Sequence, residues 1–255
     1  MVHGLETFKA YFGKHVNQYA FIGGTACDIL MEERGVPFRA THDLDIVLII
    51  EALDPSFGKT FWRFVEDGGY QHRQKGSGRE QFYRFYDPVD PAFPKMIELF
   101  SRRMDSLNLA PLSHLSPIHL DESIVSLSAI LLNDQYYALL LQGKQKLNGY
   151  SLIDLETVIL FKIRAWLDMQ ERREAGESID SRNIRKHRND VFRLLANVSP
   201  DSRTDLDANI QADVIRFMQR IDDDPPDLKN LGLKGVRLAE MLTLLAHIFR
   251  LHKGE

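Results

Sequence analysis

The spacing of apolar residues differs between the two parts of the chain. Up to about residue 150, short apolar runs bounded by Gly, Pro or polar residues predict strands, and apolar residues three or four positions apart predict helices. From about residue 153 onward only the helical period remains. The pattern therefore predicts two domains, residues 1–150 and a helical domain of residues 151–255, with the boundary near 147–152.

The same spacing predicts the bounds of the individual helices and strands. In the first part, helices are expected over 5–17, 25–33 and 55–66, and strands over 20–22, 43–50, 70–73, 81–86 and 95–100. A hairpin is expected from 124–132 and 136–141, on either side of Asn133-Asp134-Gln135. In the second part, helices are expected over 155–169, 181–195, 210–221 and 236–252. Strands and helices that alternate in this way predict an α/β fold followed by helices.

Composition and charge indicate which cellular compartment and which binding partners to expect. The single cysteine, Cys27, excludes a disulfide within the chain and suits a reducing compartment. The first residues, Met-Val-His-Gly, lack the basic and apolar regions of a signal peptide, and no apolar run approaches the roughly 20 residues that span a membrane. We therefore expect a cytoplasmic protein without a membrane partner. The net charge of −4 argues mildly against a wide nucleic-acid interface.

Two carboxylates open the most apolar strand of the chain. Asp43-Leu44-Asp45 leads into Ile46-Val47-Leu48-Ile49-Ile50, and residues two apart in a strand point to the same face. Asp43 and Asp45 therefore lie side by side, where each raises the pKa of the other. A divalent cation would relieve this repulsion, and hard oxygen ligands suit Mg²⁺ or Mn²⁺.

A glycine pair precedes this strand. Gly23-Gly24 follows the apolar run Ala20-Phe21-Ile22 and precedes the expected helix that starts at Thr25. Glycine lets a backbone approach a phosphate closely, and the amides of a helix N-terminus favour an anion. The alternative is a plain turn between a strand and a helix.

A third carboxylate lies in a later apolar run. Glu98 falls inside Met96-Ile97-Glu98-Leu99-Phe100, and burying an unpaired carboxylate is costly. Glu98 therefore needs either a metal or a salt bridge to a lysine or arginine.

Together these motifs resemble the nucleotidyltransferase superfamily related to DNA polymerase beta. More narrowly, Gly23-Gly24-Thr25-Ala26 followed by Arg39-x-Thr41-x-Asp43-Leu44-Asp45 resembles the AbiEii/AbiGii toxin-type nucleotidyltransferases. The resemblance implies a mixed sheet flanked by helices and followed by a C-terminal helical bundle. It also implies a third carboxylate on the strand beside the Asp pair, which is Glu98 here, although the family more often has Asp. It covers about residues 19–195.

The resemblance also implies two site residues in the helical part. Lys162-Ile163-Arg164-Ala165 is similar to a helical lysine that contacts nucleotide phosphate in the family, and Asp190 follows a basic run as a family aspartate does. Two plainer interpretations stay open. Lys162 would extend from a packed helix into water, and Asp190 would pair with Lys186 four residues earlier, which contributes only a few tenths of a kcal/mol.

The resemblance implies transfer of a nucleoside monophosphate from an NTP to an acceptor hydroxyl. Gly23, Gly24 and Thr25 would hold the phosphates, and Asp43, Asp45 and Glu98 the metal. Lys162 and Arg39 would stabilise negative charge, while Thr41 would bind a phosphate or orient its loop. Asp190 would position Lys162 or the acceptor.

Several acceptors and several classes of activity stay open. The toxin-type resemblance implies RNA, with the tRNA 3′ end favoured, and a cognate antitoxin protein as partner; another protein or a small molecule stays open. The basic helix over 182–193 is the candidate RNA surface. Two rival classes are a non-catalytic nucleotide-binding module of the same fold and a metal-dependent nuclease that uses the same carboxylates.

Overall fold

The computed structural model describes residues 2–39, 41, 43–74, 82–100, 130 and 133–251. The described residues divide into two compact units. The sheet unit falls within Met1–Leu120 and Leu140–Asp154, and the helical unit within Asp121–Leu139 and Leu155–Glu255.

A seven-stranded mixed sheet forms the centre of the sheet unit, with strand order β3-β4-β5-β2-β1-β7-β6. Its strands are β1 (Tyr19–Phe21), β2 (Asp43–Leu48), β3 (Gln71–Gln74), β4 (Phe82–Tyr86), β5 (Met96–Phe100), β6 (Lys144–Leu147) and β7 (Tyr150–Ile153). β2 is antiparallel to β1 and parallel to β5, and β5 is antiparallel to β4. The strand that begins with the two aspartates therefore lies in the middle of the sheet, beside the strand that carries Glu98.

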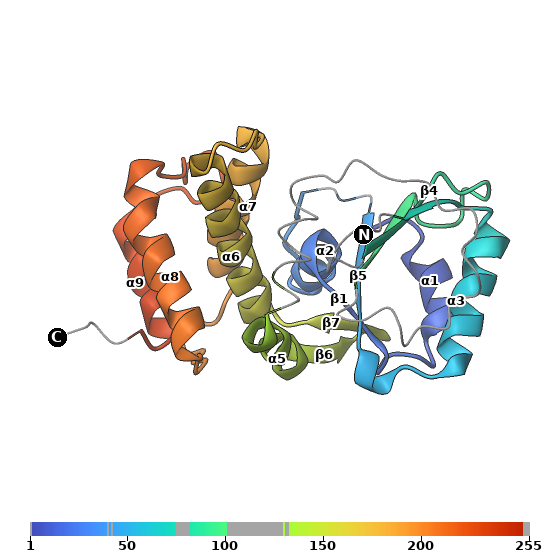
Figure 1. Cartoon of the computed structure of the whole chain (residues 1–255). Helices are drawn as coiled ribbons and strands as arrows, with labels where there is room; N and C mark the ends of the chain where they lie inside the picture. The colour runs from blue at the N-terminus through green and yellow to red at the C-terminus, as the bar shows by residue number, and fades with distance from the viewer. Residues whose placement is uncertain are drawn as a thin grey trace. The chain divides into compact units, whose positions relative to one another are not determined.

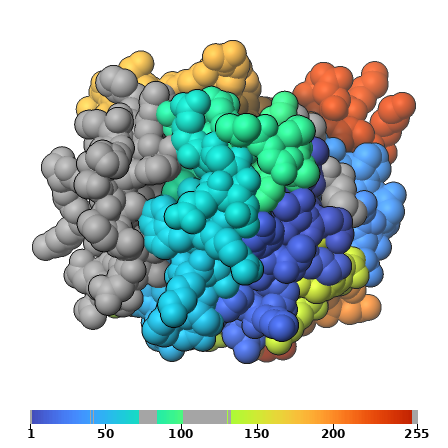
Figure 2. All heavy atoms as spheres, turned by 90° about the vertical axis from the view of Figure 1, so that its right-hand side faces the viewer, coloured from blue at the N-terminus to red at the C-terminus, as the bar shows by residue number. Residues whose placement is uncertain are grey.

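Three helices cover the two faces of this sheet. α1 (Leu5–Phe12) and α3 (Pro55–Gly68) lie on one face, and α2 (Gly23–Glu33) lies on the other (Figure 1). Figure 2 looks onto the first face, where the atoms of α1 and α3 lie side by side. A short 3-10 helix, η1 (Ile50–Ala52), joins β2 to α3.

Aromatic side chains fill the layer between α1, α3 and the sheet. Phe8 of α1 stacks on Phe12 at 4.3 Å between ring centroids and meets Phe21 of β1 at 5.1 Å. The rings that share this layer and are almost completely buried are Phe8, Phe12, Tyr19, Phe21, Phe57, Phe61, Phe64 and Phe85. Aromatic rings bury the largest apolar areas of any side chains, so this face is the hydrophobic core of the unit. The opposite face is left to α2 and to the polar residues of β2 and β5.

The predicted hairpin strand over 136–141 is wrong, because this segment is the helix α5 (Asp134–Gly143). The side chain of Asn133 accepts hydrogen bonds from the backbone amides of Gln135 and Tyr136, at 2.9 and 3.2 Å. Such a bond satisfies the amides at a helix start, so a residue taken for a turn is a helix cap. The partner strand predicted over 124–132 lies outside the described residues apart from Ile130.

A different hairpin, β6–β7, follows α5. Asn148 and Gly149 form its turn with φ of 54° and 86°. Asn-Gly is the usual pair for a two-residue turn in which both φ angles are positive. The sequence therefore carries a hairpin signal about fourteen residues after the predicted turn.

Helices make up the helical unit: α6 (Leu155–Glu174), α7 (Ser181–Leu195), α8 (Ala208–Arg220) and α9 (Leu238–Ile248), with the 3-10 helix η2 (Ile221–Asp223) after α8. α6 packs against both α7 and α8. Trp166 of α6 is completely buried and meets Phe217 of α8 edge to face at 5.1 Å. The mixed sheet with flanking helices, followed by C-terminal helices, confirms the predicted fold class.

Across the described ranges, no helix is both long enough and apolar enough to span a membrane.

Candidate active site

Three carboxylates lie on one face of two neighbouring parallel strands. The register of β2 and β5 sets Asp45 opposite Glu98 and Asp43 opposite Met96. Asp43 and Asp45 share a face because they are two residues apart, and a residue directly opposite in the register shares that face too. This is the face that α2 covers, because Asp45 meets the start of that helix. The structure therefore brings Glu98 beside the Asp pair.

The start of α2 anchors Asp45. The backbone amide of Gly24 donates a hydrogen bond to Oδ2 of Asp45 at 2.9 Å. Gly23 has a φ of 56°, and a Cβ at this position would collide with the same oxygen. A carboxylate at a helix N-terminus is stabilised by the helix dipole. Gly23 is therefore required both by its backbone conformation and by the approach of Asp45.

Thr25 and Thr41 fix the loops around this anchor. The Thr25 hydroxyl donates to the backbone carbonyl of Asp43 at 2.8 Å and accepts from the backbone amide of Asp45 at 3.3 Å. A Cβ on Gly24 would lie 2.7 Å from Oγ1 of Thr41. The Thr25 hydroxyl thus ties α2 to β2, and Thr41 lies directly against the glycine pair. The nucleotide-binding roles of both threonines stay predictions.

Arg39, the other cation predicted here, lies against a neighbouring aromatic ring. Its guanidinium carbon is 5.7 Å from the ring centroid of Phe38. This geometry fits a cation–π contact, and the predicted contact of Arg39 with phosphate stays a prediction.

Arg84 is a residue of this site that the sequence analysis did not name. It lies on β4 directly opposite Glu98, and its Nε and Nη2 both donate to Oε1 of Glu98, at 3.1 and 2.6 Å. The available signal was an arginine in the middle of the aromatic strand Phe82–Tyr86, close in sequence to a strand with a lone glutamate. The salt-bridge alternative considered for Glu98 therefore exists.

Two further carboxylates act on Glu98. Burial, and after it the neighbouring charge of Asp45, raises the pKa of Glu98 to about 8, with a smaller contribution from Asp43, while Arg84 acts in the opposite direction. A buried carboxylate with a raised pKa near further carboxylates is typical of a functional site. Arg84 thus offsets only part of the rise in the Glu98 pKa that burial and the two aspartates cause.

These oxygen donors fit a divalent cation by their chemistry. Mg²⁺ and Mn²⁺ prefer carboxylate oxygens, and a cation beside Asp43, Asp45 and Glu98 would offset the repulsion that raises the Glu98 pKa. In the described part of the chain, no group of three or more His, Cys, Asp or Glu side chains is arranged to hold a metal. Asp43 and Asp45 are thus the core of the candidate site, and Glu98 would have to turn part of its carboxylate from Arg84 towards them.

Lys162 and Asp190 meet each other in the helical unit. Nζ of Lys162 on α6 lies 3.2 Å from Oδ2 of Asp190 on α7, and the side chains are 6% and 0% exposed. Arg193 also approaches Asp190, with Nη1 3.6 Å from Oδ1. The suggestion that Asp190 positions Lys162 thus has a geometric basis, while the catalytic roles of both residues stay predictions.

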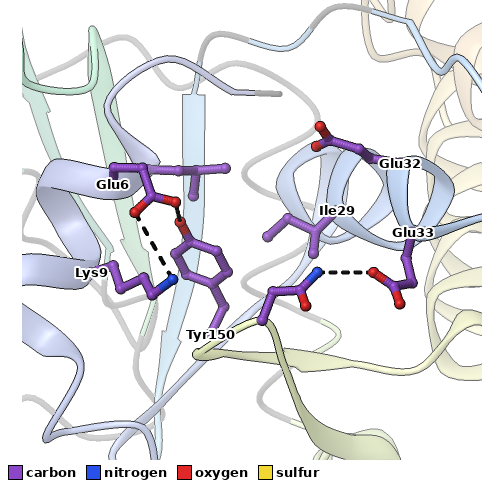
Figure 3. A pocket seen from close by; sticks show the side chains of 8 residues that line it. Glu6, Lys9, Ile29, Glu32, Glu33 and Tyr150 are labelled. Carbon is purple, nitrogen blue, oxygen red and sulfur yellow. Dashed lines mark hydrogen bonds and ion pairs between the residues drawn. The ribbon is translucent and has the colours of Figure 1, made fainter. Parts of the chain in front are cut away.

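A cavity of about 240 Å³ lies elsewhere in the sheet unit (Figure 3). It is lined by Leu5, Glu6, Lys9, Ile29, Glu32, Glu33, Asn148 and Tyr150. Glu6 accepts a hydrogen bond from the Tyr150 hydroxyl at 2.9 Å, and Glu33 accepts one from Asn148 at 2.9 Å. Three glutamates would repel a triphosphate, and none of the predicted site residues lines this cavity. We therefore do not assign it to the nucleotide.

No protein-family model matches the chain, and no curated protein sequence matches it either. Among solved structures, the chain is similar to the crystal structure of an antigenic nucleotidyltransferase-like protein from Paracoccidioides brasiliensis. The sequence identity is 14%, the TM-score is 0.46, and the match covers 94% of this chain and 97% of that chain. A similarity at this level assigns no site residue, so the proposals below depend on this chain's own residues.

Proposed function

We propose that this protein is a metal-dependent nucleotidyltransferase that moves a nucleoside monophosphate from an NTP to an acceptor hydroxyl. One observation carries the proposal. Asp43, Asp45 and Glu98 lie on one face of adjacent parallel strands, beside the N-terminus of a helix that begins with Gly23-Gly24. The order of glycine pair, helix, Asp-x-Asp strand and third carboxylate is the order that the nucleotidyltransferase resemblance implies.

Asp43, Asp45 and Glu98 would hold Mg²⁺ or Mn²⁺. When bound, the ion neutralises the charge that develops on the phosphates during an in-line displacement. The chain prepares the ligands: the Gly24 amide fixes one oxygen of Asp45, and the Thr25 hydroxyl fixes the backbone on both sides of Leu44. Asp45 and the backbone of Asp43, held in this way, need no rearrangement at the moment of reaction.

The reaction balances with the acceptor and the NTP alone. The acceptor oxygen forms a bond to the α-phosphorus, and the bond from that phosphorus to the bridging oxygen of the β-phosphate breaks. Pyrophosphate leaves, and the proton of the acceptor hydroxyl is released to solvent. Gly23 and Gly24, with Thr41 beside them, are the residues at which the phosphates would approach the backbone.

We further propose RNA as the acceptor, with the tRNA 3′ end favoured, and a cognate antitoxin protein as partner. Support comes from the toxin-type sequence motif and from α7, where Arg182, Arg185 and Lys186 are exposed. Clustered cations bind phosphate backbones and release counterions. Cytoplasmic function would follow from this proposal.

One observation favours a second candidate, a non-catalytic nucleotide-binding module. Arg84 already satisfies one oxygen of Glu98, as in a structural ion pair. In such a module the carboxylates would bind nucleotide without transferring it.

Labelling separates these candidates. The purified protein is incubated with each α-³²P-labelled NTP, Mg²⁺ or Mn²⁺ and total tRNA, beside Asp43→Asn and Asp45→Asn. The matched control is Asp222→Asn, which makes the same chemical change at an exposed residue of η2. We expect label in the RNA with the wild type and Asp222→Asn, and a loss of at least about 100-fold in both site variants, as when one stabilising group of a reaction is removed.

The other results have equally direct meanings. Label in the protein would make polypeptide the acceptor, and label in an added small molecule would make that molecule the acceptor. Nucleotide binding without label would establish the non-catalytic module. Shortened RNA without NTP would establish a nuclease, and the absence of both label and nucleotide binding would refute the proposal.

A further inference from the structure

The cavity lined by α1, α2 and the β6–β7 hairpin has apolar walls and carboxylates on two sides (Figure 3). Its walls are formed by the almost completely buried residues Leu5, Ile29 and Tyr150. Glu6 of α1 lies on one side of the cavity, and Glu32 and Glu33 at the end of α2 lie on the other. A ligand that matches this lining has an apolar middle and positive ends.

One alkylammonium group already lies in this cavity, because Lys9 of α1 lines it. Its Nζ is 5.2 Å from the centroid of the Tyr150 ring and 3.9 Å from Oε2 of Glu6. Its chain passes so close to Gly149 that a Cβ there would lie 2.7 Å from Cε of Lys9. An aromatic face is a common binding partner of organic ammonium groups. The α1 side of the cavity therefore holds an organic cation that the chain itself supplies.

The α2 side of the cavity has carboxylates without such a cation. Glu33 accepts a hydrogen bond from the neutral amide of Asn148 at 2.9 Å. Within the part of the chain that the structure describes, the carboxylate of Glu32 forms no hydrogen bond or ion pair. Burial, and after it the hydrogen bond to Glu6, raises the pKa of the Tyr150 hydroxyl, and the charge of Glu32 adds to this rise. The charge of Glu32 thus acts across the cavity.

The size and the walls of the cavity favour a short organic chain. Cavities for drug-sized ligands measure about 300–1,000 Å³, so a cavity of about 240 Å³ suits a smaller ligand. A hydrated metal ion would gain nothing from the apolar walls, because such ions prefer oxygen ligands. An unbranched amine can lay its methylene groups along apolar surface and keep its charged ends beside carboxylates, as lysine side chains do.

We propose that this cavity binds an aliphatic polyamine. The methylene chain lies along the apolar walls, and one ammonium group lies beside Glu32 and Glu33. A second ammonium group takes the place of the Lys9 ammonium on the Tyr150 ring. This site is separate from the Asp43 and Asp45 site and does not depend on the proposed transfer reaction.

Calorimetry of spermidine binding to the purified protein tests the proposal. A salt concentration of about 0.15 M screens the attraction between exposed charges more than about 8 Å apart. We expect one site in the wild type and about 10-fold weaker binding in Glu32→Gln, because a charge-assisted contact is lost. The matched control is Glu66→Gln, which makes the same change at an exposed residue of α3 outside the cavity and should leave the affinity unchanged.

A substitution of Lys9 should change the affinity in the opposite direction. Lys9→Met removes the ammonium group that occupies the Tyr150 ring, so the ring and Glu6 become available to the ligand. We expect spermidine to bind about 2–5-fold tighter, the equivalent of one exposed cation–π contact. Lys14→Met is the control, because it removes the same charge at an exposed residue that does not line the cavity.

Four results would overturn the proposal. Spermidine that binds no tighter than n-butylamine would show that the carboxylates on the two sides do not act together. Equal losses in Glu32→Gln and Glu66→Gln, or equal gains in Lys9→Met and Lys14→Met, would show that only overall charge matters. A wild type that binds no spermidine would refute the site. None of these results changes the outcome of NTP labelling, so the proposed function is tested separately.

Discussion

An ion pair is buried in each unit of the chain, and the charges around the two pairs differ in sign. In the sheet unit, Arg84 meets Glu98, whose further neighbours Asp45 and Asp43 are also acidic. In the helical unit, Lys162 meets Asp190, whose further neighbour Arg193 is basic. Glu98 thus lies near one cation and two carboxylates, whereas Asp190 lies near two cations.

We propose that this difference separates a binding site from a structural contact. Burying charges is costly unless partners compensate them. The Asp190 group is compensated inside the protein and joins α6 to α7. Around Glu98, burial first and then the charge of Asp45 hold the pKa of the carboxyl at about 8, although Arg84 lowers it. In the proposed function, a cation from outside offsets the repulsion among these carboxylates.

The largest effect on stability is expected when one partner of the Lys162–Asp190 ion pair is removed. Lys162→Met would remove the cation 3.2 Å from the completely buried Asp190 and leave the more distant Arg193, so we expect the free energy of unfolding to fall by about 3–5 kcal/mol. Urea unfolding followed by Trp166 fluorescence, in a Trp62→Phe background, reports on the helical unit alone because the chain has 2 tryptophans.

The matched double variant decides whether this pair is structural. Lys162→Met/Asp190→Leu removes both charges and should restore most of the lost stability, because apolar residues of similar volume replace buried ion pairs at little cost. A double variant as unstable as the single variant would show that Asp190 has another essential partner. The comparison between the two pairs would then fail.

A smaller effect is expected from a substitution at Gly23, which lies against Asp45 in the sheet unit. Gly23→Ala forces a Cβ into the positive-φ region and against Oδ2 of Asp45, so we expect a loss of about 1–3 kcal/mol and loss of Mn²⁺ binding. Gly58→Ala is the control, because a Cβ on this residue of α3 meets no atom within 4 Å. It should stabilise the protein by about 0.5–1 kcal/mol. Equal effects at both glycines would contradict the anchoring of Asp45.

Much of the sheet unit follows from local sequence. The Asp-x-Asp strand, the helix after Gly23-Gly24 and the strand with Glu98 lie within a few residues of their predicted bounds. Strong apolar periodicity and glycine positions fix such elements locally. The segment around Asn133 shows the limit, since Asn caps helices and also forms turns, and only the helical burial of the following residues distinguishes the two.

The partners of the charged residues did not follow from local sequence. Arg84 and Glu98 are fourteen positions apart, and the strand register brings them together. Lys162 and Asp190 are on different helices, and the packing of these helices brings them together. The sequence therefore indicates that Glu98 needs a partner, without identifying Arg84. It favours Lys186 as a partner of Asp190, because residues four positions apart are neighbours on a helix.

The free energy of unfolding is expected to depend on pH through Glu98 of the Arg84–Glu98 ion pair. The pKa of Glu98 is about 8 in the folded protein against an ordinary value of 4.5, so the folded state binds more protons between these pH values. The free energy of unfolding should therefore fall as the pH rises from about 4.5 to about 8, without divalent cations. We expect Glu98→Gln to lose this component, which amounts to at least about 1.4 kcal/mol, the equivalent of one pKa unit.

Urea unfolding at pH 5 and pH 8 measures this component. It uses Trp62 fluorescence of the wild type and Glu98→Gln in a Trp166→Phe background. The difference between the two proteins isolates Glu98 from all other titrating groups. An equal pH dependence in both proteins would show that Glu98 is compensated in the folded state, as Asp190 is.

The smallest effect is expected from the cation itself, and it tests the comparison most directly. At pH 8, Mg²⁺ at about five times its Kd should stabilise the sheet unit by about 1 kcal/mol, because it binds the folded carboxylates and not the unfolded chain. Trp62 fluorescence should report the shift, while the Trp166 transition should stay unchanged, since Asp190 already has two cationic neighbours. Asp222→Asn should keep the shift and Asp43→Asn/Asp45→Asn should lose it. Equal stabilisation of both units would mean that Mg²⁺ acts on overall charge, and the excess of carboxylates around Glu98 would then have no specific ligand.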